Sequence, residues 1–232
     1  MPRLVSQTLS VNDDVMPAIA TEILPILALT LWVSGAAVVI SSTIGIPVGV
    51  LLGLSEFRGK ALVKTLVFTG MAMPPVVAGL LLYILLSRSG PLGNWEWLFT
   101  PRAMILAQVL LDLPFVVGIT MTAAAVLPRE LVFQVRSLGA TPWQARSTLL
   151  TEMRSGVLLA LATALGRSIS EVGAVWLVGG NIEGHTRVMT TAIMLETSRG
   201  RFVVALALGT ILLSLALMAN LAIMRLQGRP AP

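Results

Sequence analysis

Five long apolar stretches set the strongest limit on what this chain can fold into. They cover residues 23–54, 61–86, 103–127, 156–178 and 202–225. A bilayer core of roughly 30 Å needs about 20 apolar residues in a helix, and each stretch reaches that length. The sequence therefore predicts an all-α, polytopic membrane protein with about five transmembrane helices.

Composition supports a membrane location for the chain. Of its 232 residues, 56% are hydrophobic and only 12% are charged, whereas a soluble domain averages about 25% charged residues. Mean hydropathy is +0.88. The net charge of +5 does not indicate nucleic-acid binding, because the basic residues do not gather with aromatic ones on a binding face.

The residue types available exclude several kinds of chemistry. The chain has no cysteine and a single histidine, His185, so disulfides, thiol catalysis and an ordinary zinc site are not expected. No catalytic set is visible either, because Asp112 is the only aspartate within the apolar stretches. We therefore predict no catalytic residue and no metal ligand.

Lysine and arginine in the connections predict the orientation in the membrane. Nine basic residues fall on one side and six on the other: Arg58, Lys60, Lys64, Arg129, Arg136, Arg146, Arg154, Arg225 and Arg229 against Arg3, Arg88, Arg102, Arg187, Arg199 and Arg201. The richer side should be cytoplasmic. This places the polar segment 1–22 outside, the membrane domain at 23–226 and a short tail, 227–232, inside.

Prolines and glycines mark interruptions of the expected helices. Pro74 and Pro75 should kink the second helix, and Gly179 with Gly180 should end the fourth. Two connections, 128–154 inside and 181–201 outside, are longer than simple turns, and loops of that length are usually functional.

The inner connection 128–154 carries the signals of two short helices around a glycine turn. Leu131, Val132, Val135 and Leu138 recur at helical spacing before Gly139. Thr141 then offers an N-cap, Pro142 suits the first helical position, and Gln144 completes a capping box. Such a hairpin either enters a groove on a partner protein or lies on the membrane surface.

The sequence RSLGATPWQARSTLL resembles the cytoplasmic loop that couples the permeases of ATP-binding-cassette (ABC) importers to their ATPases. Gly139 matches the glycine at the turn of that loop. The flanks depart from the family pattern: Phe133, Gln134 and Val135 replace Glu-Ala-Ala, and Thr151-Glu152 replaces the closing Leu-Pro.

Two further segments extend the resemblance from about residue 24 to the C-terminus. MPPVVAGLLLYILLSRSGPLG and GRSISEVGAVWLVGGNIEGHTRVMTTAI are similar to the molybdate and sulfate permease group. TEMR, SEVGAV and TRVMTTAIMLETSRG are more like the tungstate-type branch. The resemblance implies a type I ABC-importer permease for an oxyanion, with tungstate preferred and molybdate or sulfate as alternatives.

The same resemblance implies the partners and the location. Two copies of the chain would join two ATPase subunits and an extracytoplasmic oxyanion-binding protein, in the lipid of a bacterial or archaeal cytoplasmic membrane. ATP and Mg²⁺ would bind the ATPase, so no cofactor is expected on this chain, which also lacks the G-x-x-x-x-G-K-[ST] loop. The implied ATPase-coupling residues are Leu138, Gly139, Ala140, Thr141, Pro142 and Trp143.

A charged pair lies inside the fourth apolar stretch. Arg167 and Glu171 are four residues apart and share a helix face, and charges at membrane depth turn toward the protein interior. Together with Ser168 and Ser170 they either line the translocation path or only orient the helix against the one that carries Asp112. Arg187, Thr190 and Thr191 are candidates for the external mouth or a binding-protein contact.

Two other classes of protein would need features of their own. An intramembrane enzyme would need a paired catalytic set, which is missing. A self-contained channel or secondary anion transporter would show internal repeats with matching broken helices. The chain has no convincing repeat of that kind.

Overall fold

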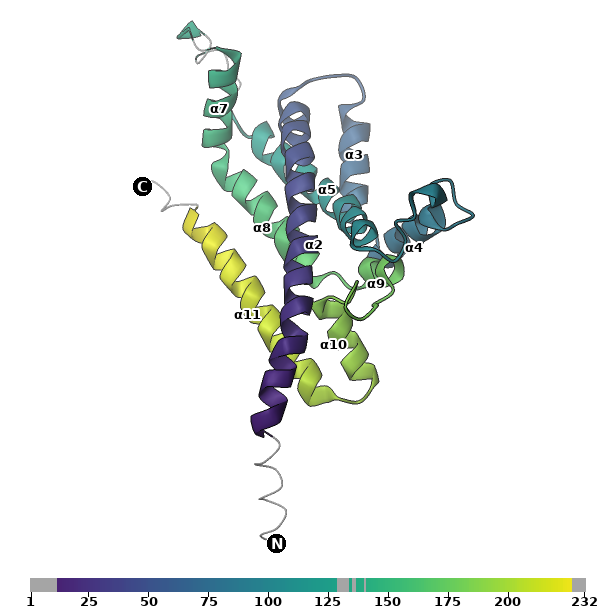
Figure 1. Cartoon of the computed structure of the whole chain (residues 1–232). Helices are drawn as coiled ribbons and strands as arrows, with labels where there is room; N and C mark the ends of the chain where they lie inside the picture. The colour runs from purple at the N-terminus through teal and green to yellow at the C-terminus, as the bar shows by residue number, and fades with distance from the viewer. Residues whose placement is uncertain (1–11, 129–133, 135–136, 140, 227–232) are drawn as a thin grey trace.

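The computed structural model describes residues 12–128, 134, 137–139 and 141–226, and this part of the chain contains helices and no strand (Figure 1). The helices are α2 Asn12–Leu54, α3 Lys60–Met71, α4 Pro75–Leu86, η1 Gly93–Trp95, α5 Pro101–Ala125, α7 Pro142–Glu152, α8 Arg154–Ser170, α9 Gly173–Gly179, α10 Met189–Ser198 and α11 Phe202–Leu226.

Three helices are each long and apolar enough to cross a membrane: Ile23–Leu54, Pro101–Ala125 and Phe202–Ile223. Two bent pairs, α3 with α4 and α8 with α9, pass the same test when each pair is taken as one span. The described residues thus hold up to five spans. The predicted all-α membrane fold is confirmed.

The sequence prediction treated each bent pair as one continuous helix, and it was wrong in both cases. The second stretch is broken between Met71 and Pro75, and its halves meet at 95°. Pro74 is the N-cap of α4 and Pro75 its first residue. Two prolines in a row remove two backbone donors and clash with the preceding turn, so the expected kink becomes a full break.

The first helix also differs from its predicted bounds. It begins at Asn12 instead of residue 23, so residues 12–22 of the predicted polar segment continue the membrane helix. Residues 1–11 and the predicted tail 227–232 lie outside the described part of the chain.

Helix α5 is the centre of the bundle and packs against α2, α3, α4, α8 and α9. Its buried Met104 and Leu111 share a core cluster with Leu82 of α4 and Val175 of α9. In contrast, α11 lies at the edge, where it contacts α8 and α10. A central α5 can therefore anchor residues that come from several other helices.

Close packing of α2 on α5 depends on three glycines spaced four residues apart. A Cβ on Gly45 would lie 2.8 Å from Val116 Cγ1. A Cβ on Gly49 would lie 2.7 Å from Thr120 Cβ, and one on Gly53 would lie 2.6 Å from the Met121 carbonyl oxygen. Small residues that let two backbones approach are typical of membrane helix interfaces.

We expect Gly49→Ala to destabilise the protein by about 1–3 kcal/mol, because the added methyl forces the α2 and α5 backbones apart. The midpoint of thermal unfolding in detergent should fall by several degrees. Gly35→Ala is the matched control, since a Cβ there meets nothing within 4 Å and alanine favours a helix. Equal midpoints for the two variants would contradict the assigned packing.

Candidate functional site

Several buried polar and charged side chains gather at the break between α8 and α9. Helix α8 ends at Ser170, α9 begins at Gly173, and the two helices are bent by 56°. Glu171 has extended backbone angles, φ −69° and ψ 130°. A broken helix frees backbone groups that lipid cannot satisfy, so this break requires partners from the protein.

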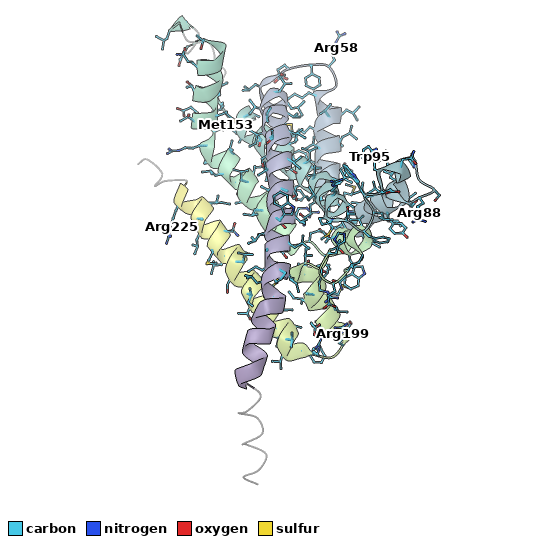
Figure 2. The ribbon with its side chains drawn as sticks, viewed as in Figure 1. Arg58, Arg88, Trp95, Met153, Arg199 and Arg225 are labelled. Atoms are coloured by element: carbon cyan, nitrogen blue, oxygen red, sulfur yellow. The ribbon has the colours of Figure 1, made fainter. Side chains whose placement is uncertain are left out.

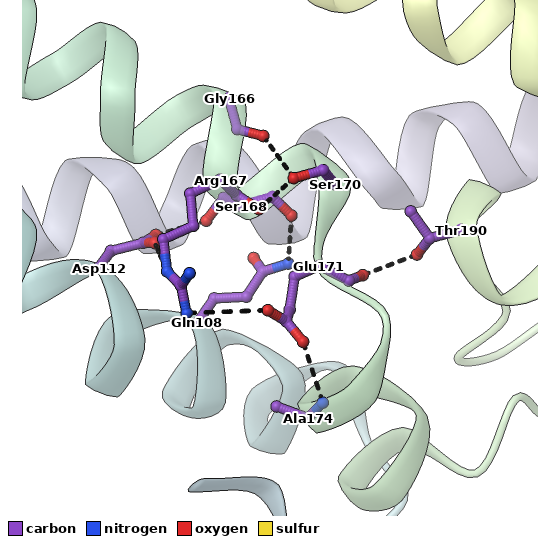
Figure 3. Close-up of polar contacts among 9 residues, drawn as sticks. All are labelled: Gln108, Asp112, Gly166, Arg167, Ser168, Ser170, Glu171, Ala174 and Thr190. Carbon is purple, nitrogen blue, oxygen red and sulfur yellow. Dashed lines mark hydrogen bonds and ion pairs between the residues drawn. The ribbon is translucent and has the colours of Figure 1, made fainter. Parts of the chain in front are cut away.

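Three side chains supply these partners (Figure 3). Gln108 Nε2 donates to the Ser168 carbonyl oxygen at 3.0 Å, and Thr190 Oγ1 donates to the Glu171 carbonyl oxygen at 2.8 Å. The Glu171 carboxylate accepts the Ala174 N–H at 3.1 Å. Side chains from α5, from α10 and from Glu171 itself therefore provide hydrogen bonds to backbone groups on both sides of the break.

A second link joins α8 to α5. The buried Ser168 hydroxyl donates to Asp112 Oδ2, so Ser168 is tied to α5 through both its side chain and its carbonyl. Asp112 is 1% exposed, and its second oxygen, Oδ1, has no hydrogen-bond partner. The end of α8 is thus fixed to α5.

Arg167 lies between two carboxylates without a hydrogen bond to either. Its Nε is 3.8 Å from Asp112 Oδ1, and its Nη2 is 3.9 Å from Glu171 Oε2. Both nitrogens are buried and lack a hydrogen-bond partner. The guanidinium also stacks on Phe115, with Cζ 4.8 Å from the ring centroid, which stabilises it by cation–π attraction.

The formal charge of this group opposes a simple anion-binding role. Two carboxylates, Asp112 and Glu171, surround one guanidinium, and their excess negative charge would repel an oxyanion in a medium of low dielectric. This conformation favours the structural interpretation of the predicted Arg167–Glu171 pair over a path lined by anion donors. Ser170 stays apart, since its hydroxyl bonds only to Gly166 and Arg167 carbonyl oxygens.

Gln108 is the member of this polar network that the sequence prediction missed. It is 3% exposed, and its partner Ser168 is 60 residues away along the chain. A glutamine within an apolar stretch was the available signal, because an uncharged amide in lipid also needs a partner.

The outer candidates occupy two different environments. Arg187 pairs with the exposed Glu183 at 3.1 Å beside a cavity of about 280 Å³ that also borders α2. Thr190 and Thr191 are buried, and their hydroxyls donate to the carbonyl oxygens of Glu171 and Val188. In this conformation the two threonines offer no outer surface to a binding protein.

The inner candidates form an exposed turn followed by a capped helix. Gly139 has φ +84°, Leu138 is 87% exposed, and the predicted capping box of Thr141 with Gln144 is present at 2.8 and 3.3 Å. Ala140 and the predicted helical positions Leu131, Val132 and Val135 lie outside the described residues, as do the side chains of Pro142 and Trp143.

No group of three or more His, Cys, Asp or Glu residues that could hold a metal is found among the described residues. The polar groups at the break form an ionic and hydrogen-bonded network, in which the Ser168 hydroxyl donates to the Asp112 carboxylate. Together with the helical spans, this network is typical of a membrane transport subunit.

The family model confirms that class and makes it specific. Residues 45–227 match the family described as "Binding-protein-dependent transport system inner membrane component", and the chain belongs to this family. It is an ABC-importer permease, a membrane subunit of a system in which ATP hydrolysis lies in separate subunits. The predicted family is confirmed, and the enzyme and channel alternatives are not supported.

Curated relatives match over most of their length. A "probable anion ABC transporter permease protein" of Haloferax volcanii is 43% identical over 205 residues, 86% of this chain and 88% of the relative. The tungstate uptake permease TupB of Peptoclostridium acidaminophilum is 39% identical over 206 residues, 89% and 90% of the two chains. The molybdenum permease ModB of Escherichia coli is 31% identical over 182 residues, 74% and 80%.

Solved structures share the fold. A bacterial alginate ABC transporter matches with a TM-score of 0.69 at 22% identity, over 90% of this chain and 79% of that one. The MetNI methionine ABC transporter matches with a TM-score of 0.66 at 23% identity, over 94% of this chain and 100% of that one. The type I importer fold is thereby confirmed.

Proposed function

We propose that this permease imports an oxyanion and that its cargo is tungstate. The observation that carries the proposal is the order of similarity among relatives of known cargo. Two tungstate permeases are 39% and 38% identical to this chain. The molybdenum permease of Escherichia coli is 31% identical and its sulfate permease CysT 28%.

We expect proteoliposomes that hold the permease, its ATPase and its binding protein to take up tungstate when ATP is supplied. Molybdate and sulfate, tested at the same concentration, should enter more slowly and compete weakly. The internal tungsten, molybdenum and sulfur are measured by mass spectrometry. Preferential uptake of molybdate or sulfate would overturn the cargo and leave the family unchanged.

The proposed assembly contains two copies of this chain, two ATPase subunits and an extracytoplasmic oxyanion-binding protein. The family description names dependence on a binding protein, and the alginate transporter of the same fold was solved in complex with a periplasmic protein. ATP and Mg²⁺ belong to the ATPase in this assembly. Arg187, beside the outer cavity, is our candidate for contact with the binding protein.

Within this assembly the segment 128–154 docks the ATPase through residues 138–143. Leu138 places an apolar side chain, 87% exposed, at the tip, and such a residue is a suitable anchor for a partner groove. The positive φ of Gly139 favours a turn, and the capping box of α7 fixes where the following helix begins. Only Met153 separates α7 from α8, so force at the tip reaches the membrane directly.

The proposed orientation puts the N-terminus outside and the C-terminus in the cytoplasm. Arg58, before α3, lies toward the end of the molecule that carries α7, and Arg199 lies toward the opposite end, whereas Arg88 and Arg225 lie between them (Figure 2). The opposite placement of Arg58 and Arg199 agrees with the sides that the basic residues of the connections assign to them.

A further inference from the structure

We propose that Arg167 is the moving part of a two-position latch, pairing with Asp112 in one transport state and with Glu171 in the other. The inference deepens the proposed function, on which it rests, by assigning positioning roles at the break between α8 and α9. We call Asp112, Arg167 and Glu171 the α8–α9 latch.

The Arg167 guanidinium lies between the two carboxylates and is not hydrogen-bonded to either. Its closest approaches to the two carboxylates are 3.8 and 3.9 Å, whereas a charge-assisted hydrogen bond needs about 2.7–2.9 Å. A displacement of about 1 Å toward either carboxylate would form a hydrogen bond there and lengthen the other contact. Arg167 therefore occupies a midpoint between two better positions.

The two carboxylates are connected to different helices. Asp112 is on α5 and is joined to α8 through Ser168. Glu171 is joined to α9, since its carboxylate accepts the Ala174 N–H at 3.1 Å. Pairing of Arg167 with Glu171 ties α9 to α8, and pairing with Asp112 releases α9 from α8.

Helix α9 is in contact with α4, and the break before it is held by α10. Gly79 of α4 packs so closely on α9 that a Cβ there would lie 2.7 Å from Ala174 Cα. Thr190 of α10 holds the Glu171 carbonyl oxygen. A change in the α8–α9 angle is therefore transmitted to α4 and to the outer segment, while the other end of α8 continues into the proposed ATPase-docking segment.

The energetics make such a latch bistable. A buried guanidinium with unsatisfied donors is costly, and each of the two displaced positions removes part of that cost. Because the two partners are both carboxylates, the two states are close in energy, and a modest input from the ATPase can shift their populations. Removing the charge of one carboxylate must bias the latch toward the other.

The test measures the α8–α9 geometry in the permease–ATPase complex in lipid nanodiscs. Because the chain has no cysteine, Leu159→Cys on α8 and Ile182→Cys after α9 give one pair of spin labels per copy at exposed positions. The labelled permease is diluted with an excess of unlabelled permease, so that distances within one copy dominate. Distance distributions are recorded without nucleotide and with a non-hydrolysable ATP analogue. We expect two distance populations whose ratio depends on the nucleotide.

Asp112→Asn and Glu171→Gln should shift that ratio in opposite directions, each by at least about fivefold. Ser168→Ala is a milder variant: it removes the donor to Asp112 Oδ2, which makes that carboxylate a stronger acceptor for Arg167, and it should shift the ratio in the same direction as Glu171→Gln. Thr122→Val is the matched control on α5, because that hydroxyl bonds only within its own helix, and it should leave the ratio unchanged.

A single distance in both nucleotide states, or shifts of equal sign in the two carboxylate variants, would overturn the latch. No anion is present in these measurements, so the result does not depend on which oxyanion is the cargo. If the three residues lined the path without moving, their variants would change uptake affinity and leave the distances as in the wild type. That outcome would also refute the proposal.

Discussion

Gly139→Val lowers the affinity of this permease for its ATPase by about tenfold or more and reduces ATP-driven uptake in proportion. Gly139 has φ +84°, a region that costs an ordinary residue about 1–2 kcal/mol and is especially unfavourable for a β-branched one. A Cβ there would meet no atom within 4 Å. The effect is therefore on the backbone turn that presents Leu138, and not on packing within the chain.

The measurement is a binding titration of the purified ATPase against nanodiscs that hold each permease variant. Gly200→Val is the matched control: Gly200 has φ +75° and equally open space, but it lies in the α10–α11 turn at the other end of the molecule. Leu138→Asp adds an independent variant that keeps the glycine and replaces the apolar anchor by a charged side chain.

We expect Gly200→Val to bind the ATPase as the wild type does and Leu138→Asp to lose most of the binding. Wild-type affinity in both Gly139→Val and Leu138→Asp would show that the docking surface lies elsewhere. Loss of affinity in Gly200→Val as well would point to general misfolding and against a specific role of the inner turn.

Local signals explain which parts of this fold the sequence could predict. The length of the apolar stretches defined the spans, and Thr141, Pro142 and Gln144 are close enough in sequence for their capping box to be read directly. Tandem prolines at 74–75 marked the bend between α3 and α4. In each case the residues that determine the structure are neighbours along the chain.

The break at Glu171 could not be predicted in this way. It contains no proline, and the groups that stabilise it come from Gln108 and Thr190 on other helices. These two residues reach the break through tertiary contacts, which the pattern of apolar residues along the sequence does not reveal. The same reason explains Thr190 and Thr191, which the sequence offered as candidates for the external mouth, although backbone partners hold both side chains in the interior.

Arg167→Gln should destabilise the permease by about 3–5 kcal/mol, because it leaves two buried carboxylates without a counter-charge. At about 2–4 °C per kcal/mol for a chain of this size, the midpoint of thermal unfolding in detergent should fall by about 6–20 °C. Arg102→Gln is the control, since Arg102 is exposed at the start of α5 and its replacement should change the midpoint by little.

Unpaired charge and lost packing can be distinguished as causes of this instability by making all three side chains neutral. A variant that combines Arg167→Gln with Asp112→Asn and Glu171→Gln removes every charge and keeps the shape of the two acidic side chains, so most of the stability lost through unpaired charge should return. If the triple variant unfolds as early as Arg167→Gln, the loss comes from packing and the electrostatic account is wrong. If it is stable, it should still fail to transport, because a neutral group has no charge with which to hold α9 in either position.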